Sequence, residues 1–321
     1  MNEFQLINKF FESEQEASLS ESVVLGIGDD CALLQMPVGK QLAVSVDTLV
    51  ADVHFPKDAP ANLIAERALR TNLSDLAAMG AEPLWFTLAL TLPQADEIWL
   101  REFSRGLFAC AGEFNIQLVG GDTTTGPLSL TIQVMGAVEN KTAMRRDAAN
   151  ADDFILVTNT LGDGAAALDV LQKKISVSEA DQDYLQERFY RPTPRLMEAQ
   201  LICELANAAL DISDGLVADL QHICERSDLG ATIFVEEIPL SAALQNLQDQ
   251  QQAYRYALTG GDDYELCFTV SPQNMPQIAM LIAEKKLSAR VVGKMHLGSG
   301  VRCELNGEEF PLMQIGYQHF S

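Results

Sequence analysis

Residues 59–92 read APANLIAERALRTNLSDLAAMGAEPLWFTLALTL, which joins a helix pattern to a strand pattern. Before Gly80, apolar residues recur every three or four positions, and this spacing predicts a helix over 59–79 with one buried stripe. Gly80 is suited to end that helix, and Pro83 prevents it from resuming. The apolar run 84–92 then predicts a strand.

The segments around this pair complete an N-terminal domain. A polar stretch at 139–153 ends the regular pattern, so residues 1–139 are predicted to form one domain and residues 140–321 another. The order of elements in the first domain is that of an α+β, ferredoxin-like sheet. Its further helices are expected at 4–16 and 95–114, and its further strands at 42–50, 116–119 and 128–138.

The second domain begins again with a strand and is predicted to be of the α/β type. Helices are expected to follow Gly162 and Gly215. The expected strands are 154–158, 231–235, 266–270 and 290–295.

Composition excludes several classes of function. The chain has 321 residues, of which 47% are hydrophobic and 21% charged, as in globular proteins with a substantial core. Its formal net charge is −23, which repels nucleic acids and anionic lipids and makes both unlikely partners. The same charge repels nucleotides, so an acidic protein that handles phosphates needs metal cations between the two.

The cysteines and the N-terminus indicate a cytoplasmic protein. Six cysteines are scattered along the chain without a Cys-x-x-Cys pair, so we expect buried thiols rather than disulfides or a zinc site. The N-terminus lacks the basic and apolar regions of a signal peptide. No apolar stretch reaches the roughly 18 residues that a membrane span needs.

Acidic residues recur beside Gly, Ser or Thr wherever an apolar run ends. Carboxylates are hard oxygen ligands, and Mg²⁺ is usually held by a few of them together with substrate phosphates. Six such elements predict a site with several metal ions and an enzyme of phosphoryl transfer. The elements are Gly28-Asp29-Asp30, Ser45-Val46-Asp47, Asn72-Leu73-Ser74-Asp75, Gly120-Gly121-Asp122-Thr123, Asp211-Ile212-Ser213-Asp214-Gly215 and Gly260-Gly261-Asp262-Asp263.

Each element also has a purely structural interpretation. Gly and Asp are common in turns, and Asp163, Asp211 and Asp214 could cap helix N-termini. Asp75 is harder to explain in this way because it lies inside the predicted helix; a salt bridge and a metal ligand are the two alternatives. Asp47 is predicted to end an apolar strand, where a buried carboxylate needs a partner or a metal.

Motifs of other phosphate-handling and hydrolytic enzymes are absent from the sequence. It contains no Gly-x-x-x-x-Gly-Lys-Ser/Thr loop and no protein-kinase motif set. It also lacks a Gly-x-Ser-x-Gly nucleophile. Among the four histidines, His54 follows the Asp47 element closely enough to touch a substrate, although a structural role is equally open.

Taken together, the acidic elements resemble those of the thiamine-monophosphate kinase family, within the aminoimidazole ribonucleotide synthetase-like superfamily. The resemblance covers nearly the whole chain and includes His54-Phe55 and the Asp-Tyr-Glu-Leu that ends at Leu266. It implies an N-terminal ferredoxin-like domain that dimerises into a shared barrel, and a C-terminal α/β domain. It further implies that ATP and thiamine monophosphate give ADP and thiamine diphosphate, with several Mg²⁺ ions and a homodimer.

The resemblance also implies roles for individual residues, none of which is a catalytic acid, base or nucleophile. The metal ligands fall on Asp30, Ser45, Val46, Asp47, Asp75, Asp122, Asp211 and Asp214. The ATP contacts fall on Gly121, Asp122, Arg146 and Ser213, and the contacts to thiamine monophosphate on His54, Asp262 and Tyr317.

Three positions depart from the family pattern. Val46 replaces a common hydroxyl residue, so only its carbonyl oxygen could reach a metal. Asp262 replaces a common Glu and has a shorter arm, whereas Tyr317 replaces another aromatic residue and keeps a ring for stacking. Two alternatives stay open: a sister synthetase of the aminoimidazole ribonucleotide or selenophosphate type, and a non-catalytic protein that binds divalent cations or nucleotides.

Overall fold

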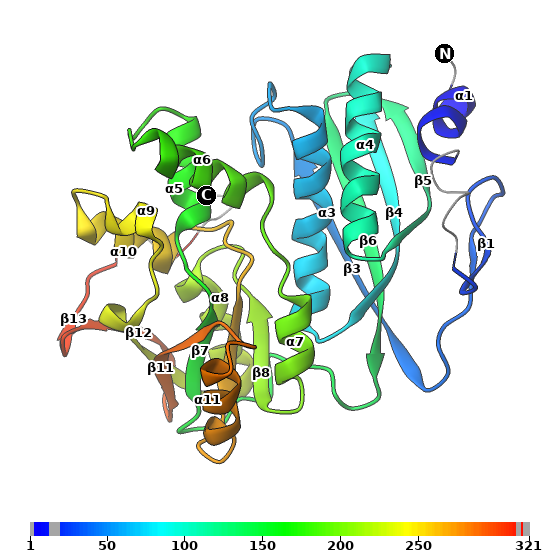
Figure 1. Ribbon diagram of the computed structural model, residues 1–321. Coiled ribbons are helices and arrows are strands. Elements are labelled where there is room, and N and C mark those ends of the chain that lie inside the picture. Colours follow the sequence, from blue (N-terminus) through cyan, green and yellow to red (C-terminus); the bar gives the residue numbers. More distant parts are fainter. Residues whose placement is uncertain (1–2, 13–19, 313–315, 317–321) are drawn as a thin grey trace. The chain divides into compact units, whose positions relative to one another are not determined.

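The computed structural model describes residues 3–12, 20–312 and 316, and its chain divides into two compact units (Figure 1). Unit 1 comprises Met1–Leu76 and Ala81–Lys141. Unit 2 comprises Ala77–Gly80 and Thr142–Ser321.

Unit 1 contains a four-stranded sheet with the strand order β3-β6-β4-β5. Strand β6 runs antiparallel to both of its neighbours, whereas β4 and β5 are parallel and therefore need the crossover helix α4 between them. The strands are β3 (Lys40–Val50), β4 (Glu82–Leu92), β5 (Gln117–Thr125) and β6 (Ser129–Glu139), and the helices are α3 (Ala61–Ala78) and α4 (Glu97–Glu113).

This arrangement confirms the mixed α+β class that the sequence predicts. Along the chain the order is strand, helix, strand, helix, strand, strand, which differs from the strand-helix-strand-strand-helix-strand order of the ferredoxin-like motif. The difference arises because helix α4 joins two parallel neighbours, so that the antiparallel hairpin comes last.

Helices α3 and α4 lie side by side on one face of the sheet (Figure 1). The stripe predicted for α3 is buried, with Ile64, Leu69 and Leu73 fully excluded from solvent. The helices touch at Gly106 of α4, where an added Cβ would lie 2.4 Å from the carbonyl oxygen of Asn62. The polar residues Arg67 and Asn72 of α3 are buried as well, so the burial of this helix extends beyond its apolar stripe.

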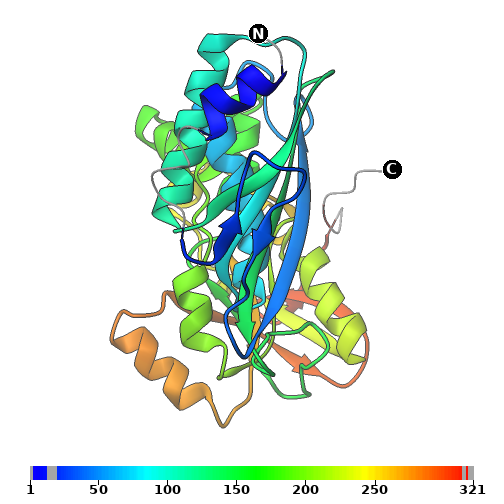
Figure 2. The same ribbon diagram turned by 90° about the vertical axis from the view of Figure 1, so that its right-hand side faces the viewer.

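The hairpin of β1 (Val23–Leu25) and β2 (Leu33–Leu34) packs on the other face of the sheet (Figure 2). Val23 joins Trp85 and Val119 in a small apolar cluster, and the Trp85 indole Nε1 donates a hydrogen bond to Ser22 Oγ at 3.2 Å. Further along the same face, the β3 side chains Leu42, Val44 and Val46 are 49–57% exposed. We call these three residues the β3 apolar stripe.

The N-terminal helix is less regular than its apolar spacing predicts. An α-helical turn, α1 (Glu3–Ile7), is followed by a π-helical segment, η1 (Asn8–Glu12), which buries Phe10 and Phe11. The last part of the predicted helix, at 13–16, lies outside the described residues.

Unit 2 is built on a seven-stranded sheet with the order β13-β12-β9-β11-β7-β10-β8, antiparallel except for the β9–β12 pair. Its strands are β7 (Phe154–Thr158), β8 (Ala206–Asp211), β9 (Gly230–Phe234), β10 (Leu266–Val270), β11 (Ala289–His296), β12 (Gly300–Leu305) and β13 (Glu308–Glu309). Its helices are α5 (Asp163–Leu171), α6 (Glu179–Tyr190), α7 (Leu196–Ile202), α8 (Leu216–Ser227), η2 (Val235–Glu237), α9 (Ala242–Gln245), α10 (Gln250–Thr259) and α11 (Met275–Ala283).

Both faces of this sheet are buried, which explains why its central strands read as continuous apolar runs. In β7, Ile155 and Val157 point into a core shared with α8 and α10. Leu156, between them, points into a second core shared with α7 and α11. The loops at the strand ends are thus held by a rigid, two-sided core.

Within the described part of the chain, none of the helices has the length and apolar character needed to cross a bilayer. All six cysteines are free thiols, as predicted. The prediction that all are buried is wrong for Cys31, which is exposed in the β1–β2 hairpin, and for Cys203, which is half-buried.

Two glycines of α4 provide a matched test of helix packing. We expect Gly106→Ala to lower the free energy of unfolding by about 1–3 kcal/mol, because the new methyl group collides with the Asn62 backbone. Gly112→Ala meets nothing within 4 Å and should be neutral or stabilising by about 0.5 kcal/mol. Urea unfolding of both variants measures the difference, and equal midpoints would contradict this account of the contact.

Candidate active site

In unit 1, strand β3 and helix α3 bring three of the predicted metal ligands together. Alternation along β3 turns Ser45 and Asp47 toward the helices, and the helical spacing aligns Asn72 with Asp75. The Ser45 hydroxyl donates to Asp75 Oδ2 at 2.5 Å, and the Asp47 amide donates to Asn72 Oδ1 at 3.1 Å. The side chain of Val46 points to the other face, where it belongs to the β3 apolar stripe.

The prediction that Asp47 ends an apolar strand is wrong, although the predicted end of the strand at Val50 is confirmed. Strand β3 continues to Val50 because β6 pairs with it along its whole length, and Asp47 lies opposite Ile132. Its side chain is exposed. Asp47 therefore does not need a partner to offset burial, and its side chain is accessible from solvent.

Asp122 lies at the opposite edge of the same sheet. The Gly-Gly-Asp-Thr element, which we expected after a strand, is itself part of β5. Position 121 requires a glycine, because a Cβ added there would lie 1.9 Å from the Leu88 carbonyl oxygen. Asp122 pairs with Ala89, and two further strands separate it from β3. Three strand spacings of about 4.8 Å put it roughly 14 Å from β3, so one sheet does not bring Asp122 to Asp47.

Two further predicted site residues lie in turns of unit 1: Asp30 is exposed and His54 is half-buried. Asp30 lies in the β1–β2 hairpin, where its amide donates to Asp29 Oδ1 at 2.8 Å. The His54 ring accepts a hydrogen bond from the Val50 amide at Nδ1 (3.0 Å), so a neutral imidazole carries its proton on Nε2. The buried Arg67 donates to the His54 carbonyl oxygen at 3.2 Å and holds this turn in place.

In unit 2, the loop after β8 and the loop before β10 are joined by backbone hydrogen bonds. The Asp262 amide donates to Ser213 O at 2.9 Å, and the Tyr264 amide donates to Ile212 O at 2.8 Å. A third bond runs from the Ile212 amide to Glu265 O at 2.8 Å. The residues implied in binding ATP, metal and acceptor (Ser213, Asp214 and Asp262) are therefore neighbours in unit 2.

The loop after β8 is organised by a carboxylate that the sequence analysis missed. Asp219 Oδ2 accepts hydrogen bonds from the amides of Ser213, Asp214 and Gly215 at 3.0–3.1 Å. The alternative interpretation of Asp211 and Asp214 as helix caps does not hold, because Gly215 is the N-cap and Asp219, inside α8, satisfies the free amides. The sequence does carry a signal for this role, because Asp219 lies in the first turn of the predicted helix, where a carboxylate can accept bonds from free amides.

Burial raises the pKa of Asp219 to about 7, although the backbone amides favour the charged form. The negative charge of Asp214 raises the pKa of Asp219 further, whereas the positive charge of Arg146 lowers it. Arg146, implied as an ATP contact, thus acts electrostatically on the same loop.

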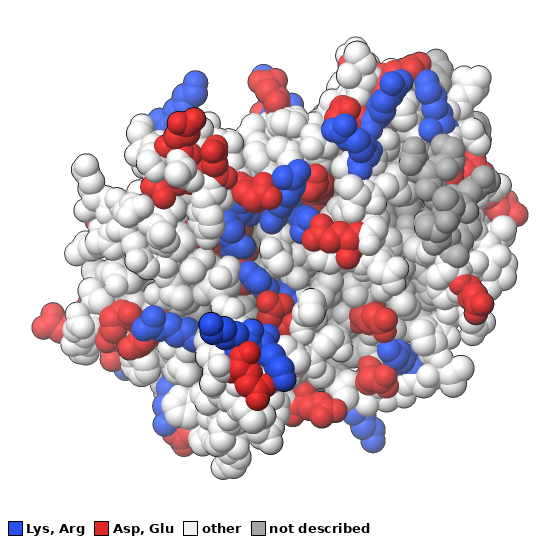
Figure 3. All heavy atoms as spheres, viewed as in Figure 1, with Lys and Arg blue, Asp and Glu red and all other residues white. Residues whose placement is uncertain are grey.

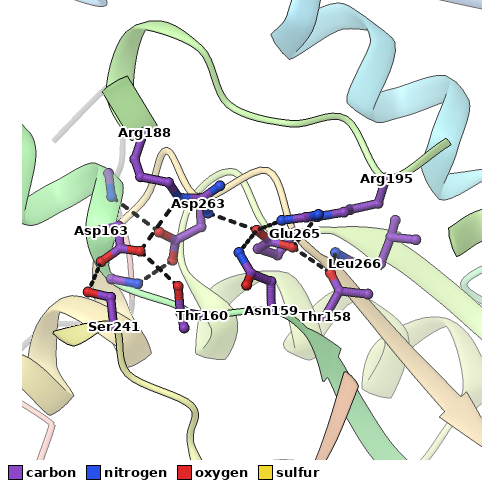
Figure 4. A network of polar contacts seen from close by, with 12 residues as sticks. Thr158, Asn159, Thr160, Asp163, Arg188, Arg195, Ser241, Asp263, Glu265 and Leu266 are labelled. Atoms are coloured by element: carbon purple, nitrogen blue, oxygen red, sulfur yellow. Dashed lines mark hydrogen bonds and ion pairs between the residues drawn. The ribbon is translucent and has the colours of Figure 1, made fainter. Parts of the chain in front are cut away.

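A cluster of buried charges lies beside these loops (Figure 4). We call Asp163, Arg188, Arg195, Asp263 and Glu265 the buried charge cluster. Glu265 is fully buried and accepts bonds from Arg195 Nε and Nη2, both at 2.6 Å, and from Arg188 Nη2 at 2.7 Å. The prediction that Asp163 caps a helix is wrong, since its carboxylate accepts bonds from the side chains of Thr160, Tyr184 and Ser241.

Among the described residues, no three His, Cys, Asp or Glu side chains are grouped to hold a metal ion. The oxygen donors of the Ser45–Asp75 pair and of the loop after β8 nevertheless suit Mg²⁺, which takes few protein carboxylates and completes its shell with water and phosphate oxygens. Tyr317, implied as a substrate contact, lies outside the described residues.

The surface charges of the described residues do not form a basic patch on the face that Figure 3 shows. Lys and Arg side chains are interspersed with Asp and Glu.

Comparison with known proteins gives matches over both units. The family "AIR synthase related protein, N-terminal domain" matches residues 28–138, and "AIR synthase related protein, C-terminal domain" matches residues 150–306. Thiamine-monophosphate kinase from Escherichia coli (strain K12) is 46% identical and covers 99% of this chain and 98% of its own.

Solved structures of related proteins are also similar to this chain over nearly its whole length. Thiamine-monophosphate kinase from Stenotrophomonas maltophilia K279a is 43% identical with a TM-score of 0.86, over 97% of this chain and 98% of its own. AaThiL complexed with AMPPCP and TMP is 30% identical with a TM-score of 0.78, over 99% of this chain and 96% of its own.

The raised pKa of Asp219 predicts a pH dependence of stability. The unfolded chain releases this proton near pH 3.8 and the folded chain near pH 7, so the folded state binds more protons between these values. The free energy of unfolding therefore falls as pH rises through this window.

In metal-free buffer, we expect the wild type to lose about 1.4 kcal/mol per pH unit relative to Asp219→Asn between pH 4 and 7. The Asn variant keeps the acceptor oxygen but has no proton to release. Urea unfolding at several pH values measures the two curves; parallel curves would show that the carboxyl has no raised pKa.

Proposed function

Because the chain belongs to the AIR synthase related family, and within it to the thiamine-monophosphate kinases, we propose that it transfers the terminal phosphoryl group of ATP to thiamine monophosphate. The products are ADP and thiamine diphosphate. The observation that carries this conclusion is the 46% identity to a thiamine-monophosphate kinase over nearly the whole of both chains. The relative AaThiL, complexed with AMPPCP and TMP, supports the choice of both substrates.

In this proposal, the loop after β8 binds the phosphates of ATP. Ser213 offers a hydroxyl group beside a loop whose conformation Asp219 fixes through three amides. Arg146 carries the guanidinium group that would pair with phosphate oxygens, a role to which its planar donors are well suited. Gly121 and Asp122 of β5 are the remaining proposed ATP contacts.

Mg²⁺ ions, when bound, would neutralise phosphate charge and align the two phosphates for in-line transfer. We propose the oxygen atoms of eight residues as ligands. Ser45, Asp47 and Asp75 support this best, because β3 and α3 already bring them together. The full set is Asp30, Ser45, Val46 (through its carbonyl oxygen), Asp47, Asp75, Asp122, Asp211 and Asp214.

The reaction needs no general base from the protein. The attacking group is a phosphate oxygen of thiamine monophosphate, and the second pKa of a phosphate monoester is about 6, so it is ionised near neutral pH. The protein's task is to bring two polyanions together and to hold them in line. We propose that His54, through its Nε2–H, and Asp262 and Tyr317 hold the acceptor.

We also propose that the chain acts as a homodimer in which the sheets of two copies close into a shared barrel. The β3 apolar stripe supports this, because Leu42, Val44 and Val46 leave three apolar side chains half-exposed on one strand. A long exposed edge strand of this kind is normally covered. Asp122 pairs across the sheet with Ala89, Thr131 and Thr48, and it therefore lies on the same face as the stripe.

The direct test is to incubate the purified protein with Mg-ATP, with and without thiamine monophosphate, and to identify products by mass spectrometry. We expect ADP and thiamine diphosphate in equal amounts, and little ADP without the acceptor. A folded protein that binds Mg-ATP but forms no thiamine diphosphate would contradict the proposed function.

In the same assay, Asp47→Ala should reduce kcat far more than His54→Ala. Loss of a metal ligand should lower kcat at least about 100-fold. Mutation of residues that only hydrogen-bond to metal ligands already lowers metal affinity or activity 10–100-fold. His54→Ala should act mainly on KM for thiamine monophosphate, because it removes a binding contact. Equal losses of kcat in both variants would contradict this division of roles.

For the dimer, we expect Val44→Lys to give a monomer in size-exclusion chromatography with light scattering, because it places a charge in the β3 apolar stripe. Leu297→Lys is the matched control, since Leu297 is 82% exposed and lies in unit 2. A dimer that survives Val44→Lys, or a wild-type monomer, would show that the stripe is not the interface.

A further inference from the structure

The segment 260–265 carries Asp262 in an unusual backbone conformation. Asp262 and Tyr264 both have positive φ values, 70° and 54°, which side-chain-bearing residues seldom adopt. Two such residues so close together are unfavourable unless the surrounding structure imposes them. Strain of this kind concentrates at functional sites, so its cause here is informative.

Asp263, the residue between them, anchors the segment to the interior. Its carboxylate is almost fully buried and accepts hydrogen bonds from the amides of Gly162 at 2.7 Å and Gly164 at 3.3 Å. Gly164 also leaves no space for movement, because a Cβ there would lie 2.3 Å from the Asp262 carbonyl oxygen. The loop before α5 and the segment 260–265 are therefore in close backbone contact.

Glu265 anchors the other end of the segment in the buried charge cluster (Figure 4). Arg195 donates two hydrogen bonds to the Glu265 carboxylate, from Nε and Nη2. The side chains of Thr158 and Asn159 also donate to it, at 2.6 and 3.2 Å. Burial alone would lower the pKa of Arg188, but the charges of Glu265 and Asp163 raise it, so the arginine stays charged. The Glu265 side chain is fully buried, and these donors fix the position of its carboxylate.

Stability alone is a poor explanation for so many buried charges. The desolvation of buried ion pairs largely cancels their attraction, and apolar replacements are often as stable. What the cluster does provide is a fixed position for the backbone on either side of Tyr264.

That position lets the Tyr264 hydroxyl donate a hydrogen bond to Asp262 Oδ1 at 3.0 Å. We propose that Tyr264 is a positioning residue that orients the Asp262 carboxylate for recognition of the acceptor's ring system, with the buried charge cluster holding both residues in place. The thiazolium ring of thiamine carries a permanent positive charge, so a carboxylate with a fixed direction is complementary to it. This inference rests on the proposed function.

The test is a double-mutant cycle with Tyr264→Phe and Asp262→Asn. Tyr264→Phe removes one hydroxyl group and keeps the ring, so we expect KM for thiamine monophosphate to rise about tenfold, the effect of one hydrogen bond to a charged group. KM for ATP and kcat should change less than twofold. In an Asp262→Asn background, Tyr264→Phe should have no further effect, because it acts through the carboxylate.

Tyr256→Phe is the matched control. Tyr256 donates to Asp169 Oδ2 at 2.7 Å, so this variant also removes one tyrosine-to-aspartate hydrogen bond, but one that joins α10 to α5 and leaves the backbone contact of Tyr256 with Gly260 unchanged. Its kinetic constants should match those of the wild type. Equal effects of both Tyr variants would indicate a general loss of packing and would overturn the proposal.

Two other results would also overturn the inference: additive losses in the cycle, or an equal rise in both KM values for Tyr264→Phe. The proposed function is judged separately, on the wild type. A wild type that forms no thiamine diphosphate refutes the function itself, whereas an active wild type with an unaffected Tyr264→Phe variant refutes only the role of Tyr264.

Discussion

A carboxylate can be buried only where hydrogen-bond donors or cations surround it, and unit 2 is organised by this constraint. Glu265 is satisfied by two arginines, Asp263 by two glycine amides and Asp219 by three amides of one loop. Burial raises the pKa of Asp263 well above its usual range, so the donors only partly offset the desolvation. Glu265 and Asp263 draw together segments that are distant in sequence, whereas Asp219 fixes the loop directly before its own helix.

In unit 1, three of the four carboxylates proposed to bind metal are exposed, and only Asp75 is half-buried. Asp30, Asp47 and Asp122 are exposed, on a hairpin and on the two edge strands of the sheet. Hydrated cations can reach carboxylates that are exposed to solvent. A chain with a net charge of −23 can then accept two phosphorylated substrates only together with their cations. Exposure thus distinguishes these three carboxylates from Glu265, Asp263 and Asp219, whereas the proposed metal ligand Asp211 is itself buried.

The sequence predicted most of the elements and the chemical nature of the site, because apolar periodicity and acidic motifs are local signals. It placed the Gly-Gly-Asp-Thr element beyond a strand, whereas this element lies within β5. The reason is that pairing with β4 extends β5 past the point where the apolar run stops. Asp219 was missed because its role depends on amides that only the folded turn directs to one point.

The two kinds of carboxylate also explain why no protein cage of three acidic side chains is found among the described residues. A complete cage would hold a cation tightly without substrate, whereas Mg²⁺ in phosphoryl transfer has to gain and release phosphate oxygens in every turnover. Paired donors such as Ser45 and Asp75 leave most of the coordination shell for water and phosphate. Open donors of this kind on the sheet of unit 1 therefore favour a metal site that forms together with its substrates.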